Sequence, residues 1–164
     1  MISVDILFSK GAEEWDAGNL KVAFELFKRA ADLGDGDSMN NVAIFYENGI
    51  GLEKNIRKAI FWYENAFPLI GAVAANNLAS LYKNLGESGK AVVWYHKAIE
   101  LGDGDAMVEL GEMYLYGEGV SRSCDEAAAL FVGAIESTDI TDESKGRASE
   151  HLSSIHFLLG NNGQ

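Results

Sequence analysis

Proline and cysteine are almost absent from this chain. Its 164 residues include one proline, Pro68, and one cysteine, Cys124. A lone cysteine excludes a disulfide within the chain. The scarcity of proline leaves long runs rich in Ala, Leu, Glu and Lys, and these residues favour helix. The composition therefore predicts an all-α protein.

Basic residues are also scarce, because 13 Lys and Arg face 25 Asp and Glu, for a net charge of −12. Nucleic acids and anionic membranes are bound by clustered Lys and Arg, so we expect neither as a partner. Residues 1–82 carry 7 basic and 11 acidic side chains, and residues 83–164 carry 6 and 14. This excess of acid either keeps the protein soluble or steers a basic partner toward the C-terminal half.

Long apolar runs are missing as well. No segment approaches the 18 or so uninterrupted apolar residues of a membrane span. The N-terminal sequence MISVDILFSKGAEEW has no basic region and no small-residue cleavage site, so it does not resemble a signal peptide. We expect a cytoplasmic, soluble protein, although a chain whose leader had been removed would look the same.

What the chain does have is an internal repeat. The pentapeptide LGDGD occurs at positions 33 and 101, an offset of 68 residues. The same offset relates Met39 to Met107, Tyr46 to Tyr114, Gly49 to Gly117, Ala59 to Ala127 and Ala66 to Ala134. Repeats of this kind predict a stacked scaffold with a binding surface rather than a single enzymatic pocket.

Apolar residues recur within each repeat at helical spacing, and glycines end the pattern. Short loops join the helices into antiparallel pairs that must stack to bury their apolar faces. The prediction is one domain, residues 1–164, folded as a right-handed α-solenoid of about nine helices. The expected helix pairs are about 3–34, 37–67, 72–101 and 105–136, followed by a C-terminal capping helix at about 143–159.

The motif Ala-x-x-x-Leu-Gly-x-x-Tyr-x-x-Gly-x-Gly-Val followed by Ala-x-x-(Trp/Leu)-(Tyr/Phe)-x-x-Ala resembles the Sel-one-like repeat, a relative of the tetratricopeptide repeat. Ala106–Val120 with Ala127–Ala134 matches best, and Ser38–Ile50 with Ala59–Ala66 is a second good copy. The chain departs from the pattern at Ser38, where the family has Ala. It also departs at His156, where the family has Tyr.

The resemblance implies that the first helix of each pair lines a concave side. Residues next to the packing stripe would contact a protein or peptide there. Apolar and aromatic side chains would anchor a basic partner, with acids around them. The partner-binding residues expected on this basis are Asn40, Ile44, Glu47, Asn76, Ser80, Lys83, Val108, Glu112, Leu115, Tyr116, Ser154 and Phe157.

The sequence contains no strong catalytic or metal-binding motif. The DGD sequences do not fit a calcium loop, because the positions that need further ligands hold Met39 and Met107. We interpret Asp37 and Asp105 instead as caps of the helices that follow. No nucleophile with a base and an orienting partner is recognisable, so we expect no catalytic residue, no metal and no cofactor.

The sequence thus favours a non-catalytic protein-interaction module. A narrower alternative is an inhibitor that neutralises a bacterial toxin by covering its basic surface, as immunity proteins do. A rival class is a small hydrolase or metal-dependent enzyme, for which Glu150, His151 and His156 would be the cluster. Self-association is a third possibility.

Overall fold

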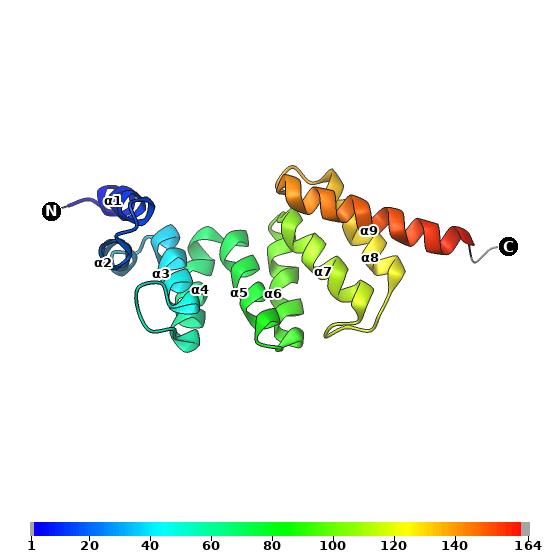
Figure 1. The fold of residues 1–164 in the computed structure, drawn as a ribbon, viewed down its shortest axis with the longest axis horizontal. Helices are drawn as coiled ribbons and strands as arrows, with labels where there is room; N and C mark the ends of the chain where they lie inside the picture. The colour runs from blue at the N-terminus through cyan, green and yellow to red at the C-terminus, as the bar shows by residue number, and fades with distance from the viewer. Residues whose placement is uncertain (1, 162–164) are drawn as a thin grey trace. The chain divides into compact units, whose positions relative to one another are not determined.

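Side-chain caps fix where several of the helices begin. The computed structural model describes residues 2–161, and side chains as far as residue 157. In this range the chain forms nine α-helices and no strand (Figure 1). They are α1 (Val4–Asp16), α2 (Leu20–Asp32), α3 (Gly36–Asn48), α4 (Ile56–Ile70), α5 (Ala72–Asn84), α6 (Ser88–Glu100), α7 (Gly104–Tyr116), α8 (Cys124–Glu136) and α9 (Asp142–Asn161). The prediction of an all-α helical repeat fold is confirmed.

The caps of α3 and α7 lie two residues earlier than the sequence indicated. Asp35 accepts a hydrogen bond from the backbone N–H of Ser38 at 2.8 Å, and Asp103 accepts one from that of Ala106 at 2.8 Å. Asp37 and Asp105 lie in the first helical turns, so the prediction that they are the caps was wrong. The cap must have extended backbone just before the helix, and of each Asp pair only the first residue does.

The two glycines of each LGDGD segment serve different purposes. Gly34 and Gly102 have φ angles of 96° and 94°, which a residue with a side chain rarely adopts. Gly36 and Gly104 lie inside the next helix, at places where the neighbouring residues leave no room for a side chain. A Cβ on Gly104 would lie 2.7 Å from the backbone oxygen of Asp139, to which the Gly104 N–H donates a hydrogen bond. The repeated LGDGD sequence therefore indicates both a turn and a close contact at the start of the helix that follows.

The chain divides into two compact units, one ending at Leu78 and the other beginning at Ala79. In the first unit, α1 packs against α2, α2 against α3, and α3 against α4. Its core contains Phe27 and Phe45, and Trp15 contacts both: ring centroids lie 4.6 Å apart for Trp15 and Phe45 and 6.2 Å apart for Trp15 and Phe27. Small residues such as Ala23 are fully buried beside these rings, and a small side chain at such a place allows helices to approach closely.

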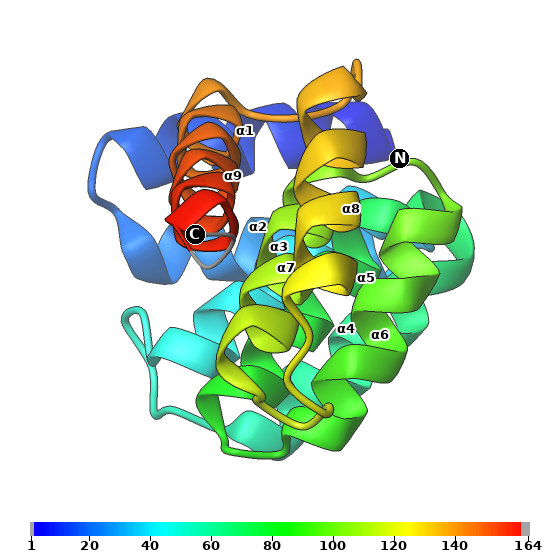
Figure 2. The same cartoon turned by 90° about the vertical axis from the view of Figure 1, so that its right-hand side faces the viewer.

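In the second unit, α6 packs against α7, and α7 packs against α8. The last helix, α9, lies against both α7 and α8 (Figure 2). Phe131 of α8 is fully buried in a core that also contains Val108, Ala148 and Ile155. Because α9 covers α7, part of the α7 surface that would otherwise be exposed to solvent is buried in the core.

Pro68 lies inside α4, which continues to Ile70, beyond the expected end of this helix pair at residue 67. Gly71 ends the helix, and its N–H donates to the backbone oxygen of Phe67 at 2.9 Å. The extra turn brings Leu69 and Ile70 against Gly36, where a Cβ would lie 2.8 Å from either side chain. The additional residues after the repeat motif thus pack on the start of α3.

Ser38 is a local defect in the first unit. Its side chain is fully buried, and its hydroxyl has no hydrogen-bond partner in the part of the chain that the structure describes. A buried polar group without a partner costs about 1–3 kcal/mol. We expect Ser38→Ala to raise the free energy of unfolding by about 1 kcal/mol, measured by urea denaturation.

The matched change is Ala106→Ser, because residue 106 occupies the same place in the fourth repeat and is fully buried. This substitution should lower stability by about 1 kcal/mol. A Ser38→Ala protein that is less stable than the natural chain would show that the hydroxyl is satisfied after all.

Candidate functional site

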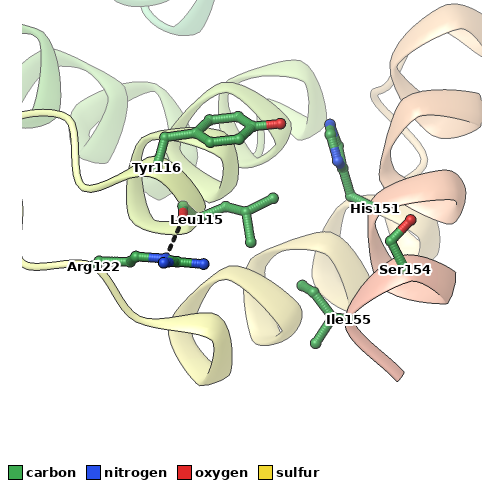
Figure 3. Close-up of a pocket in the computed structure, with 6 residues that line it drawn as sticks. All are labelled: Leu115, Tyr116, Arg122, His151, Ser154 and Ile155. Atoms are coloured by element: carbon green, nitrogen blue, oxygen red, sulfur yellow. Dashed lines mark hydrogen bonds between the residues drawn. The ribbon is translucent and has the colours of Figure 1, made fainter. Parts of the chain in front are cut away.

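A cavity of about 440 Å³ opens between the C-terminal end of α7 and the middle of α9 (Figure 3). It lies wholly within the second unit. Leu115 and Tyr116 come from α7, Arg122 comes from the loop before α8, and α9 contributes the rest of the lining, namely His151, Ser154 and Ile155. Two smaller cavities, of about 290 and 400 Å³, lie in the first unit and contain none of the predicted binding residues.

Apolar groups form the base of this cavity. Ile155 is only 2% exposed, and Leu115 is half-buried beside the core around Phe131. Tyr116 stands at the edge with 61% of its surface exposed, and its hydroxyl points toward α9 (Figure 3). An apolar base with an exposed aromatic at the edge suits the burial of one side chain from a binding partner.

Arg122 is held at the mouth of the cavity by the backbone. Its Nε donates a hydrogen bond to the backbone oxygen of Leu115 at 3.0 Å. This bond ties the loop to the end of α7 and satisfies one of the carbonyls that a helix leaves unpaired at its C-terminus. It also orients the guanidinium alongside the Leu115 side chain (Figure 3).

His151 is fixed by three neighbours. Its ring stacks on Phe131 with centroids 5.1 Å apart, and it meets the ring of Tyr116 edge-on at 6.4 Å. Its Nε2 donates to a carboxylate oxygen of Glu112 at 3.0 Å, because an ionised carboxylate can only accept. The imidazole therefore forms a rigid side of the cavity.

Behind this side, ion pairs link three helices. Lys83 of α5 pairs with Glu109 of α7 at 2.9 Å, and Arg147 of α9 bonds Glu109 at 2.9 Å and Glu112 at 2.6 Å. Burial acts to raise the pKa of Glu109, but Lys83 and Arg147 outweigh it and hold that pKa below its usual value. The hydrogen bond to Glu112, followed by that to Glu109, raises the pKa of Arg147 despite its partial burial.

The structure brings some of the predicted residues of the second unit together. Leu115, Tyr116 and Ser154 line the cavity, and Lys83 and Glu112 belong to the ion-pair network behind it. Ser80 is bonded to the Tyr95 hydroxyl at 3.1 Å, while Phe157 is 69% exposed on α9. Val108 is fully buried in the core beside Ala148 and Ile155, so the expectation that it projects toward a partner was wrong. The cause is α9, which covers that part of α7.

The predicted residues of the first unit make contacts within that unit. Asn40 is 9% exposed and accepts a hydrogen bond from the Asn77 side chain at 2.9 Å. Glu47 accepts one from the Tyr63 hydroxyl at 2.7 Å. Ile44 and Asn76 are half-buried. These contacts give the polar residues structural roles within their own unit.

Sequence reasoning missed four residues of the site. Arg122 and Ile155 went unremarked as lining residues, and His151 entered only as a member of a catalytic alternative. Arg147 was not singled out, although it bonds residues 35 and 38 positions away. The sequence did offer one signal, which is complementary charge. Arg147 and His151 lie four residues apart on α9, so they share one face of that helix. Glu109 and Glu112, three residues apart, share one face of α7 and could pair with them.

Two further observations concern the described part of the chain. Within residues 2–161, no helix combines the length and apolar character that crossing a membrane requires. Over the same residues, no three His, Cys, Asp or Glu side chains are grouped so that they could hold a metal ion. His156 and Glu150, named for the enzymatic alternative, are both exposed, whereas His151 is committed to Glu112.

Successive antiparallel helix pairs define a helical repeat scaffold, a class of protein that offers extended surfaces for binding other proteins. The model of the Sel1 repeat matches residues 7–35, 36–67, 72–103 and 104–136. The chain belongs to the Sel1 repeat family, as the Sel-one-like motifs indicated.

Relatives agree with this assignment. A sel1-like repeat-containing protein of Acanthamoeba polyphaga mimivirus is 32% identical over 90 residues, which make up 55% of this chain and 17% of that protein. The present chain thus corresponds to a small part of this relative.

Solved structures show the same fold. A Sel1 repeat protein from Oxalobacter formigenes aligns with a TM-score of 0.73 at 23% identity, over 99% of this chain and 74% of its own. A protective antigen of uropathogenic Escherichia coli strains aligns with a TM-score of 0.70 at 21% identity, over 94% of this chain and 45% of its own. At these identities the likeness concerns the fold alone.

Proposed function

We propose that this protein is a non-catalytic interaction module that binds a segment of another protein in the cavity between α7 and α9. The observation that carries the proposal is the position of Leu115, Tyr116 and Ile155, which form an apolar base and an exposed aromatic edge within a repeat scaffold. The partner would lie on the side formed by α7 and α9, which the resemblance predicts to be concave.

Tyr116 is the main anchor in this proposal. Exposed tyrosines beside a desolvated base are typical of residues that dominate binding energy, because they bury a large area and lose little conformational freedom. The fixed orientation of His151 means that this side of the cavity needs no ordering when a partner binds. Phe157, exposed two residues beyond Ile155, extends the apolar surface along α9.

The partner's overall charge is a separate part of the proposal. Glu47 and Glu112 were expected to contact a basic partner, but each already accepts a hydrogen bond within the chain. A basic partner would therefore be attracted over a distance by the net charge of −12, through exposed acids such as Glu118 and Glu150. Affinity that does not fall as salt is raised would contradict this part of the proposal.

The inhibitory alternative is a version of the same function in which the bound protein is a toxin. It adds the requirement that the complex block the toxin's activity. Measuring that activity with and without this chain would test it, and undiminished activity in a saturated complex would exclude it.

The experiment for the proposed function compares three forms of the protein as baits in the native lysate, with quantitative mass spectrometry. Tyr116→Ala should reduce the amount of the specific partner retained by about tenfold or more, as for the loss of an aromatic anchor. Val132→Ala is the matched control, because Val132 is a 41% exposed apolar residue of α8 outside the cavity. If both variants retain the partner equally, the partner binds elsewhere.

A further inference from the structure

The polar side chains that line the cavity comprise one guanidinium, one imidazole and two hydroxyls. They are the Arg122 guanidinium, the His151 imidazole, and the hydroxyls of Tyr116 and Ser154. No carboxylate is among the lining residues, although residues 83–164 carry 14 acidic and only 6 basic side chains. The cavity therefore differs in chemistry from the unit that surrounds it.

Arg122 is the group that sets this chemistry. Its Nε is used by the Leu115 backbone oxygen, and no carboxylate of the described residues pairs with its guanidinium. The other basic residue near the cavity, Arg147, is fully engaged by Glu109 and Glu112. Arg122 thus presents an oriented cation with its two terminal nitrogens available at the mouth of an apolar cavity.

We propose that the cavity recognises a peptide segment in which an apolar side chain stands next to an aspartate or glutamate. The apolar side chain enters the base formed by Leu115 and Ile155, and the carboxylate accepts hydrogen bonds from the Arg122 guanidinium. This inference rests on the proposed function, because it specifies the segment that the α7–α9 cavity binds.

Size and charge both favour this occupant. A volume of about 440 Å³ accommodates one large apolar side chain with part of its neighbour. A guanidinium and a carboxylate form two parallel hydrogen bonds, which makes the contact directional and stronger than one between neutral groups. A lysine or arginine of the partner at the same place would meet Arg122 with like charge and would find no carboxylate among the lining side chains.

The hydrogen bond from Arg122 to the backbone also reduces the repulsion that a carboxylate would meet at this place. The C-terminal end of a helix carries partial negative charge, which would repel a carboxylate. Because Arg122 bonds the Leu115 carbonyl, part of this charge is neutralised where the carboxylate would lie. A partner that is basic as a whole can still present such a segment, since the contact depends on one of its side chains.

The test is selection from a phage-displayed library of random peptides on the whole chain. Peptides that bind the natural protein should share an apolar residue beside Asp or Glu. A selected peptide, made synthetically, should bind Arg122→Gln about tenfold or more weakly. Lys145→Gln removes the same charge from an exposed position of α9 that does not line the cavity, so its affinity should match that of the natural protein.

A second pair of measurements shows whether the two groups contact each other. Changing the acid of the peptide to its amide should weaken binding to the natural protein by about tenfold, but should add little loss with Arg122→Gln. Equal losses with both proteins would overturn the proposed contact.

The outcomes also separate the two proposals. Peptides that need Tyr116 but show no preference for an acid would overturn this inference and leave the proposed function standing. Binding peptides that are indifferent to Tyr116→Ala, or a selection that yields none, would overturn both.

Discussion

Replacing Arg147 with alanine is expected to lower the free energy of unfolding by about 1–3 kcal/mol at pH 7. The guanidinium bonds Glu109 and Glu112, whose side chains are only 23% and 14% exposed. Its removal leaves two largely buried carboxylates close together, with Lys83 and His151 as their remaining partners. The expected loss is smaller than for a fully buried pair, because the Arg147 side chain is itself 34% exposed.

The pH dependence gives this prediction a second readout. The pKa of Glu109 in the folded protein is lowered, so its ion pairs stabilise the fold above the pKa that glutamate has when unfolded, about 4.3. This stabilisation is lost as pH falls through the lowered pKa. The difference in stability between the natural chain and Arg147→Ala should therefore shrink between about pH 5 and pH 3.

Urea denaturation followed by circular dichroism at pH 7, 5 and 3 measures this difference. Lys145→Ala is the control, since it removes an exposed cation two residues away on the same helix. A loss for Arg147→Ala that is no larger than that for Lys145→Ala, or that stays constant with pH, would mean that the network contributes little.

The second large effect is expected at Gly111, in the buried face of α7. A Cβ at this position would lie 2.7 Å from the Cε1 atom of Phe131, which is fully buried and cannot swing into solvent. Gly111→Ala should therefore cost about 1–3 kcal/mol of stability by overpacking, even though alanine favours helix more than glycine does. Because Phe131 also carries the stacked ring of His151, the cavity should be disturbed too.

The same substitution at Gly146 should have the opposite sign. Gly146 lies within α9, and apart from its chain neighbours and the backbone of its own helix no atom lies within 4 Å of the place that its Cβ would occupy. Alanine there removes only the conformational cost of a helical glycine, so stability should rise by about 0.5–1 kcal/mol. Thermal melts of both variants test the pair, and shifts in the same direction would show that Phe131 adapts to the added methyl group.

The repeat pattern made the core predictable. Ala59 and Ala127, Ala66 and Ala134 recur at a fixed offset because each lies where two helices cross, and all four are fully buried. Such packing is local to a helix pair and recurs in each copy, so one sequence contains several examples of it. The caps were harder to place, because DGD offers two aspartates and the helix could begin after either.

The site was only partly predictable. The positions of Leu115 and Tyr116 follow from the repeat geometry. Arg122 lies in a loop, and the path of that loop determines which groups its side chain contacts. Arg147 joins α9 to α7 over more than thirty residues, and such pairings leave no periodic trace in the sequence. Val108 was misplaced because the repeat pattern could not show how closely the last, unpaired helix covers α7.

The most direct test of the central claim, that the α7–α9 cavity binds a protein, is photo-crosslinking. The photoreactive residue p-benzoylphenylalanine replaces Tyr116 in one protein and Val132 in another, and both are irradiated in the native lysate. Binding in the cavity predicts a single major adduct from position 116, weakened by Leu115→Asp in the same protein and absent from position 132. The same adducts from both positions, or none from position 116, would contradict the claim.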